Sequence, residues 1–145
     1  MTMLKRINLC VADMERSLAL YRDILGLKVN ALKESKADSY SYPVFAFPRQ
    51  AKLRFATLDT PTQERAMALT EVRGVALPRP SLPHVSAVVL NCVDFDGVIA
   101  KVTALGLKVV AEQPLPGDDG KPKGREAALV DHDGHLIVLY KLNGQ

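Results

Sequence analysis

The sequence predicts an α+β fold built from two tandem modules, each with the element order strand, helix, strand, strand, strand (βαβββ). Three observations support this prediction. The residues Gly-Leu-Lys-Val occur at 26–29 and again at 106–109, which indicates an internal repeat. In each copy they follow a stretch of helical periodicity and open an apolar strand. Each copy also begins with alternating apolar and polar residues, the pattern of a strand with two different faces.

The first module begins with a strand and a capped helix. In the strand, Ile7, Leu9 and Val11 alternate with Arg6, Asn8 and Cys10. Asp13 follows, and an aspartate at this place can accept a hydrogen bond from the free N–H groups that begin a helix. The helix carries Leu18, Tyr21 and Leu25 at helical spacing. We expect it to end at Gly26.

The second module begins in the same way. Its first strand is expected where Val85, Ala87 and Val89 alternate with His84, Ser86 and Val88. Asp94 or Asp96 can cap the helix that follows. That helix presents an apolar stripe of Val98, Val102 and Leu105. Gly106 is expected to end it.

The remaining strands and the boundary between the modules follow from the same repeat. Residues 53–59 resemble residues 125–131, and residues 66–72 match residues 136–142. A proline-rich segment separates the two copies, a composition typical of a linker. We therefore expect one domain, residues 1–145, made of modules at about 1–73 and 83–145 with a linker at 74–82.

Two longer loops are also expected. Residues 33–50 are rich in Ser, Tyr and Pro, and residues 112–124 are rich in Pro and Gly. Loops of this length often carry function, although surface connections are the commoner case.

Composition excludes several classes of function. Hydrophobic residues make up 48% and charged residues 24% of the 145 residues, which is typical of a globular protein and not of a disordered or fibrous one. The 19 Lys and Arg residues form no long basic block beside 16 Asp and Glu residues, so no nucleic-acid partner is expected. No apolar run approaches the roughly 20 residues of a membrane span, so no membrane partner is expected. Cys10 and Cys92 match no disulfide or metal spacing, which favours a reduced, cytoplasmic protein.

Two segments together resemble the vicinal oxygen chelate superfamily. They are residues 8–29, NLCVADMERSLALYRDILGLKV, and the Asp-Gly-His-Leu-Ile turn and strand at 133–137. That superfamily includes glyoxalase I, bleomycin-resistance proteins, fosfomycin-resistance enzymes and extradiol dioxygenases. The resemblance implies two βαβββ modules that form a cupped, eight-stranded mixed sheet around one cavity, usually in a homodimer. It does not select a reaction, because this fold serves many.

The resemblance also implies where a metal ion is held in metal-dependent relatives, namely by side chains from the first and fourth strands of each module. Counting back seven residues from Asp13 reaches Arg6, and the corresponding residue of the second copy is taken as His84. The fourth-strand positions fall on Ala68 and Val138. Arginine stays protonated and repels a cation, and the side chains of Ala68 and Val138 have no donor atom. We therefore expect no metal and no other cofactor.

Other nearby candidates for a metal ligand do not restore this site. Glu71 lies three residues beyond Ala68, and strand alternation should point it to the opposite face. His132 and His135 lie in a polar Asp-His-Asp-Gly-His turn and are expected to be solvated.

The predicted cavity is lined by Arg6, Asn8, His84, Ser86 and Tyr140, among mostly apolar neighbours. Arg6 can anchor a carboxylate, phosphate or phenolate, or it can reach solvent or a nearby carboxylate. His84 can act as a general base or a hydrogen-bond donor to a ligand, or it can be satisfied by backbone or water. Tyr140 can donate a hydrogen bond to a ligand or can pack as a strand residue.

The favoured function is binding of a small anionic or hydrophobic molecule without the metal site. This resembles the bleomycin-resistance branch, although a cationic ligand such as bleomycin suits a mildly basic chain poorly. One alternative is a metal-free isomerase or lyase, in which Arg6 polarises an oxygen and His84 moves a proton. Another is a metal-dependent glyoxalase- or dioxygenase-type enzyme with rearranged ligands. A purely structural dimer is the last.

Overall fold

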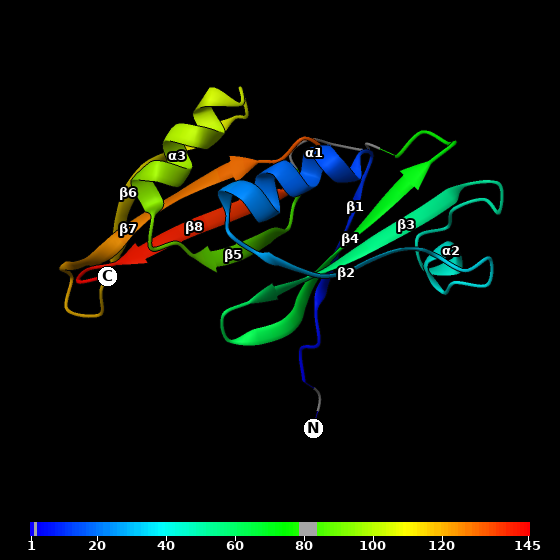
Figure 1. The fold of residues 1–145 in the computed structure, drawn as a ribbon. Coiled ribbons are helices and arrows are strands. Elements are labelled where there is room, and N and C mark those ends of the chain that lie inside the picture. Colours follow the sequence, from blue (N-terminus) through cyan, green and yellow to red (C-terminus); the bar gives the residue numbers. More distant parts are fainter. Residues whose placement is uncertain (2, 79–83) are drawn as a thin grey trace. The chain divides into compact units, whose positions relative to one another are not determined.

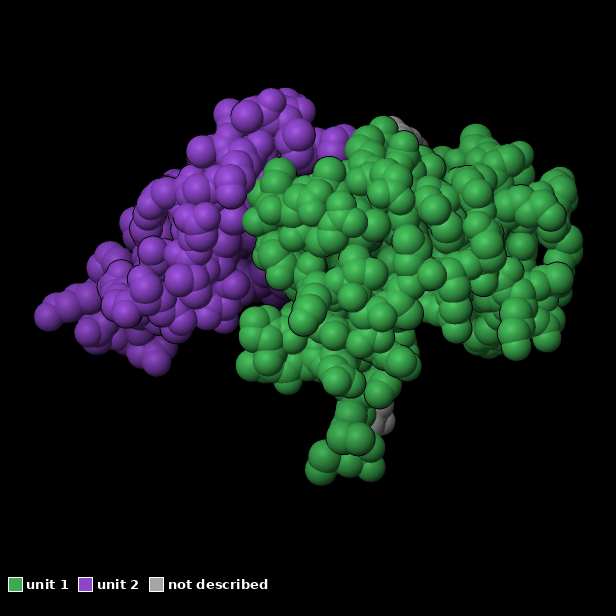
Figure 2. All heavy atoms as spheres, viewed as in Figure 1, with its two compact units in different colours: residues 1–78 green, residues 79–145 purple. Residues whose placement is uncertain are grey.

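The chain forms two compact units, residues 1–78 and 79–145, in a computed structural model that describes residues 1, 3–78 and 84–145 (Figures 1 and 2). Residues 79–82 of the predicted linker, and residue 83, lie outside the described residues. The first unit contains β1 (Ile7–Val11), α1 (Met14–Leu18), η1 (Ala19–Ile24), β2 (Lys28–Glu34), α2 (Ser41–Val44), β3 (Lys52–Thr60) and β4 (Gln63–Arg73). The second contains β5 (Ala87–Asn91), α3 (Phe95–Ala104), β6 (Val109–Pro116), β7 (Pro122–Val130) and β8 (Leu136–Leu142).

Each unit has the predicted βαβββ order and forms one four-stranded mixed sheet. The strand order is β1-β4-β3-β2 in the first sheet and β5-β8-β7-β6 in the second. In each sheet the first and last strands of the unit pair in parallel, and the other pairs are antiparallel. The predicted α+β fold with eight strands in two modules is therefore confirmed.

The first helix begins and ends at the predicted residues. The Asp13 carboxylate accepts a hydrogen bond from the backbone N–H of Arg16 at 3.0 Å. Gly26 adopts a φ of +77°, a conformation that favours glycine, and the helix ends there. Between them the helix changes from α1 to the π-helix η1. The sequence spacing did not predict this change.

The first sheet has two chemically different faces. Glu71 marks the face that carries the helix, because its carboxylate accepts the backbone N–H of Met14 in α1 at 2.6 Å. Strand alternation places the neighbouring positions on the other side, which we call the distal face. The distal face comprises Asn8, Cys10, Lys33, Phe55, Thr57, Ala68 and Thr70, which adjoin one another in the register of the four strands.

One end of the distal face is covered by the segment between β2 and β3. Tyr42 and Ala51 from this segment form a buried cluster with Leu53 and Val72 of the sheet. The Tyr42 hydroxyl donates a hydrogen bond to the Ala51 carbonyl oxygen at 2.8 Å. The expected loop at 33–50 is therefore a packed cover that contains the short helix α2.

The expected loop at 112–124 is largely a β-hairpin instead. Strands β6 and β7 extend to Pro116 and from Pro122, so that residues 117–121 alone form the turn. Prolines at strand ends are compatible with pairing, because an edge strand such as β6 needs fewer ladder donors. Among the described residues, no helix is long and apolar enough to cross a membrane.

The pairing registers correct the sequence alignment of the two modules. Leu58 pairs with Met67 in the first unit, and Leu129 pairs with Ile137 in the second. Arg54 is consequently the counterpart of Arg125, one residue away from the match expected from residues 53–59 and 125–131. Two short apolar strands can be aligned one residue out of step with little loss of sequence similarity. In the sheet, a shift of one residue would turn every side chain to the opposite face.

Candidate functional site

The sheet registers identify which residues occupy the four positions where the resemblance places metal ligands. Arg6 immediately precedes Ile7, which pairs with Met67. In the second unit Val88 pairs with Ile137, the counterpart of Met67, and the residue immediately before Val88 is Ala87. The expectation that His84 corresponds to Arg6 is therefore wrong. His84 lies three residues earlier, before β5 begins.

The residues at these positions do not fit a divalent metal ion. They are Arg6, Ala68, Ala87 and Val138, of which three have no donor atom in the side chain and one carries a permanent positive charge. Among the described residues, no group of three or more His, Cys, Asp or Glu side chains lies close enough together to hold a metal ion.

Glu71 does not replace the missing ligands, as its position in the strand predicted. Its side chain is 6% exposed and lies on the helix-bearing face. Arg54 donates to both carboxylate oxygens at 3.1 and 3.2 Å, and Arg73 Nε lies 3.0 Å from Oε1. The hydrogen bonds to Glu71 raise the pKa of Arg54. Glu71 therefore joins the start of α1 to the sheet through ion pairs.

The predicted site residues of the second unit do not converge on one point. The backbone N–H of His84 donates to the Gly134 carbonyl oxygen at 2.9 Å, beside the start of β8. Tyr140 pairs with Asn91 at the far end of β5, about 13 Å along the strand from its first residue, Ala87. Ala87, and not Ser86, shares the face of Tyr140. Strand β5 begins at Ala87, later than predicted, because its partner β8 begins only at Leu136.

In the first unit, the predicted residues Arg6 and Asn8 belong to one continuous surface. Asn8 pairs with Ala68, and Ala68 pairs with Thr57 on the next strand. The Thr70 hydroxyl donates to the Asn8 side-chain oxygen at 2.9 Å, which leaves the Asn8 amide N–H groups for another acceptor. The small side chain of Ala68 therefore lies between two polar side chains.

Two groups of the first unit, Thr57 beside Ala68 and Arg6 just before β1, have unused capacity to bind a polar ligand. Thr57 is 3% exposed, and its buried hydroxyl has no hydrogen-bond partner among the described residues. A buried hydroxyl without a partner costs free energy, which a ligand atom or a water molecule can recover. Arg6 precedes β1 and is half-buried, and no hydrogen bond or ion pair joins it to another described residue.

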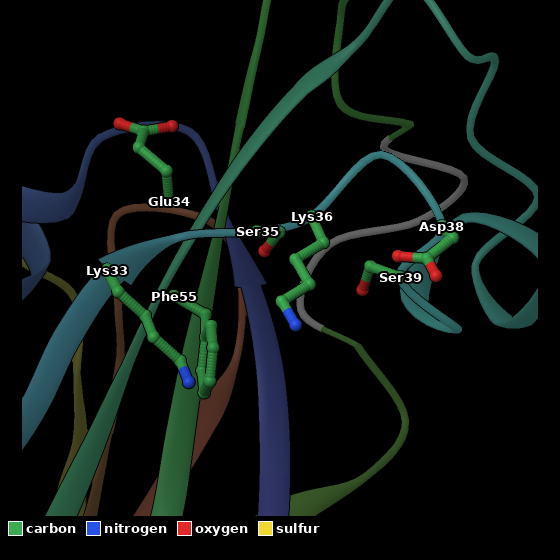
Figure 3. A pocket seen from close by; sticks show the side chains of 7 residues that line it. All are labelled: Lys33, Glu34, Ser35, Lys36, Asp38, Ser39 and Phe55. Carbon is green, nitrogen blue, oxygen red and sulfur yellow. The ribbon is translucent and has the colours of Figure 1, made fainter.

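A pocket of about 240 Å³ lies at the β2 end of the distal face (Figure 3). Its lining residues are Lys33, Glu34, Ser35, Lys36, Asp38, Ser39 and Phe55. The Lys33 ammonium lies 5.2 Å from the centre of the Phe55 ring, a cation–π contact. Figure 3 shows Glu34 pointing away from these two side chains, and Arg73 binds its carboxylate at 2.6 and 2.8 Å. The side wall of the pocket therefore combines an aromatic ring with a cation.

Three residues of this surface were not predicted from the sequence, namely Lys33, Phe55 and Thr57. A pattern that indicates Phe55 and Thr57 was nevertheless present. Phe55 and Thr57 alternate with apolar residues in a strand that the repeat had already located. Lys33 was assigned to a loop, whereas β2 extends to Glu34. Extending the alternation argument to this hairpin would have placed all three on the distal face.

The Asp-His-Asp-Gly-His turn is more buried than expected. Asp133 is 1% exposed and Asp131 is 6% exposed, and Asp131 Oδ1 accepts the backbone N–H groups of Asp133 and His135 at 2.9 and 2.8 Å. The Nδ1 atoms of His84 and His135 lie 3.2 Å apart, with the two rings nearly perpendicular at 71°. The two aspartates are therefore buried in the turn's own hydrogen-bond network, while His132 and His135, the residues expected to be solvated, are each partly exposed.

Comparison with known proteins gives a family and several similar folds. The family model described as Glyoxalase/Bleomycin resistance protein/Dioxygenase superfamily matches residues 3–139. A glyoxalase family protein from Bacillus cereus has a TM-score of 0.72 at 16% identity, covering 97% of this chain and 93% of that one. A glyoxylase/bleomycin resistance protein/dioxygenase domain from Frankia has a TM-score of 0.66 at 17% identity, covering 99% of both chains.

A third solved structure was determined with ligands. It is a mutant of the fosfomycin resistance protein FosX from Listeria monocytogenes, complexed with Mn(II) and a dihydroxypropylphosphonic acid. Its TM-score is 0.64 at 17% identity, covering 99% of this chain and 94% of that one. No curated protein matches the chain.

Proposed function

The chain belongs to the Glyoxalase/Bleomycin resistance protein/Dioxygenase superfamily, and from this membership we propose that it binds a small anionic or hydrophobic molecule on its distal face, without the four-ligand metal centre. One observation carries the proposal. A half-buried arginine, Arg6, takes the place of a first-strand ligand and has no ion-pair partner among the described residues. A guanidinium at that place attracts the same anionic oxygens that a metal ion would hold.

The neighbouring side chains favour a ligand with one anionic end and one apolar end. The Asn8 amide and the Thr57 hydroxyl offer hydrogen bonds beside Ala68. Phe55, two residues from Thr57 on the same strand, offers an aromatic surface. Sites for small molecules are commonly built in this way, from apolar walls with a few placed polar groups. FosX, whose fold is similar, was solved with a small phosphonic acid, an anion that carries two hydroxyl groups.

We rank binding above metal-free catalysis by Arg6 and His84. A general base needs a nitrogen that can reach the substrate, and the Nδ1 of His84 lies 3.2 Å from the Nδ1 of His135. An isomerase or lyase that uses His84 would have to work through its other ring nitrogen. Turnover of a bound compound, lost in His84→Gln with binding retained, would reverse this ranking.

The proposal is tested by titrating phenylphosphonate into the protein and measuring heat by isothermal calorimetry, with benzyl alcohol as the neutral matched compound. We expect phenylphosphonate to bind the wild-type chain and to bind Arg6→Gln at least about tenfold more weakly, since a hydrogen bond to a charged group contributes roughly 1.5–3 kcal/mol. Thr57→Val keeps the shape of the side chain and should weaken binding several-fold.

Lys5→Gln is the control for this titration, because it removes an adjacent exposed positive charge and should leave affinity within about twofold, as expected for a screened surface charge. Equal affinity of wild type and Arg6→Gln would refute the proposed anion site. Preference for benzyl alcohol over phenylphosphonate would place the ligand in the hydrophobic class instead.

We further propose that the protein acts as a homodimer in the cytoplasm. The family resemblance supports the dimer. The cysteines support a reducing compartment, since Cys10 and Cys92 form no disulfide. Burial also raises the pKa of the Cys92 thiol, which disfavours its oxidation.

A further inference from the structure

We propose that His84 and His135 form a binding site for a divalent transition-metal ion, separate from the four positions at which the family carries its ligands. The Nδ1 atoms of the two rings lie 3.2 Å apart. A tetrahedral Zn²⁺ ion with Zn–N bonds of about 2.0–2.1 Å holds its nitrogen ligands about 3.3 Å apart. The two rings therefore already present one edge of such a coordination shell.

Both histidines are held in place by their backbones. The N–H of His84 donates to the Gly134 carbonyl oxygen at 2.9 Å. The N–H of His135 donates to the carboxylate of Asp131 at 2.8 Å. Because the two anchoring groups belong to one tight turn, the separation of the rings is fixed locally within the second unit. A preorganised pair of ligands loses little entropy when an ion binds.

The ring geometry also suits a shared ion. The ring centres lie 4.8 Å apart and the planes meet at 71°, so the rings do not stack, and the two Nδ1 atoms lie within hydrogen-bond distance at 3.2 Å. Without metal, one Nδ1–H donates to the other Nδ1, and the accepting ring carries its proton on Nε2. When metal binds, the donor ring gives up its Nδ1 proton and takes one on Nε2, so the neutral pair keeps both of its protons.

The chemistry of the ligands defines the class of ion. Imidazole nitrogens suit Zn²⁺, Ni²⁺ and Cu²⁺ and do not suit Mg²⁺ or Ca²⁺. No third His, Cys, Asp or Glu among the described residues completes the group, so water or an added small molecule fills the remaining positions. This site does not depend on the proposed anion site, because its two ligands lie in the second unit and Arg6 lies in the first.

The test is calorimetric titration of the full chain with Zn²⁺ alone, followed by nitrogen NMR of the histidine rings. We expect one Zn²⁺ ion to bind per chain. Loss of a directly bound ligand should weaken binding at least about tenfold in His84→Ala and in His135→Ala. The chain has 3 histidines, so their ring signals can be followed separately. The Nδ1 signals of His84 and His135 should shift on Zn²⁺ addition, while those of His132 should not.

His132→Ala is the matched control, since it removes the third imidazole from the same turn and should retain Zn²⁺ affinity. Circular dichroism on every variant checks that it folds, and the NMR readout on the wild-type chain needs no variant. Absence of Zn²⁺ binding to the wild-type chain would overturn the proposal. So would unchanged affinity in His84→Ala and His135→Ala, or equal loss of affinity in His132→Ala.

Discussion

Glu71 shows how one buried carboxylate can join three elements. It accepts the first N–H of α1 and pairs with Arg54 on β3 and with Arg73 on its own strand. The carboxylate therefore faces an N–H at the start of the helix and two guanidinium groups, which carry partial or full positive charge. Removal of the carboxylate charge therefore weakens the acceptor of the first N–H of α1 and takes one carboxylate partner from each arginine, although Arg73 keeps Glu34 at 2.6 and 2.8 Å.

We expect Glu71→Gln to lower the free energy of unfolding by about 3 kcal/mol, the range found when one partner of a buried ion pair is removed. Urea unfolding at neutral pH measures this change. Glu15→Gln is the control, because its side chain is 67% exposed and lies 3.9 Å from Arg54, and it should cost less than about 0.5 kcal/mol. Equal losses in the two variants would show that burial of Glu71 is not what matters.

At the level of single residues, strand alternation predicted the orientation of Glu71 correctly, whereas the absence of a metal ion at Arg6, Ala68 and Val138 stays a prediction. The sequence did not predict Ala87 or the contact of His84 with His135. The alternating pattern continues from residue 84 through residue 89 and gives no sign of where the strand begins. Pairing decides that point, because a strand can extend only as far as its partner.

Gly124 in β7 lies close against the backbone of the neighbouring strand β8. A Cβ atom at this position would overlap the carbonyl oxygen of Lys141 on β8. A backbone atom in a paired strand cannot move aside as a flexible side chain can. The absence of a side chain at residue 124 is therefore a requirement of the β7–β8 pairing.

We expect Gly124→Ala to reduce the melting temperature by at least about 3 °C, as roughly 1 kcal/mol or more of lost stability would in a chain of this size. Differential scanning calorimetry measures the change. Gly97→Ala is the comparison, because the three atoms nearest its Cβ would all belong to the side chain of Asp94 and helix propensity favours alanine. A larger loss in Gly97→Ala than in Gly124→Ala would contradict this account.

Arg125 connects α3 to two strands of the second sheet. It donates to Glu112 at 2.6 and 2.9 Å and to Asp96 at 2.7 and 3.0 Å. These hydrogen bonds hold the pKa values of Asp96 and Glu112 below the ordinary carboxyl range. Their contribution to stability is therefore complete above the unfolded pKa of about 4 and is lost as pH falls through the lower folded values.

We expect Arg125→Met to melt at a lower temperature than wild type at pH 6, and the difference to shrink as pH falls toward 2. Methionine retains the apolar contact with Phe95, whose ring centre lies 4.7 Å from the Arg125 guanidinium carbon. Thermal unfolding of both chains across this pH range measures the effect. A gap between the two melting curves that stays constant with pH would assign the role of Arg125 to packing.

At the level of elements, the capping residues were the most informative part of the sequence. The first helix begins after Asp13 and ends before Gly26, as predicted. Gly106 follows α3 and has a φ of +77°. Asp94 precedes α3, although its side chain makes no capping hydrogen bond. The π-helix η1 was not predicted, because its pairing of Leu25 N–H with the Leu20 carbonyl leaves no distinct pattern in the sequence.

At the level of the whole molecule, the repeat predicted two modules and eight strands, and both are present. The alignment of the repeats failed by one residue at β3 and β7 and by three residues at the start of β5. Matching letters locate a repeat, but only the strand register says which residues are equivalent.

The homodimer proposed from the family is tested by sedimentation equilibrium. The chain has a mass of 15.8 kDa, and we expect a particle of about twice that mass at micromolar concentration, since the family resemblance implies a dimer and C2 dimers are the commonest homo-oligomers. Dilution should shift the distribution toward the single chain. A mass that stays at the single-chain value at every concentration would remove the dimer from the proposed function.

Arg54 and Arg125 occupy equivalent positions in the two units, and each contacts an acidic residue of a helix. Arg54 lies 3.9 Å from Glu15 of the first helix, and Arg125 lies 2.7 Å from Asp96 at the matching place in α3. The strand partners have opposite charges, since Arg54 pairs with Glu71 and Arg125 with Lys141. The arginine-to-helix contact is therefore the same in both units, although the strand partner changes from an acid to a base. A carboxylate at the neighbouring strand position is not required for this contact.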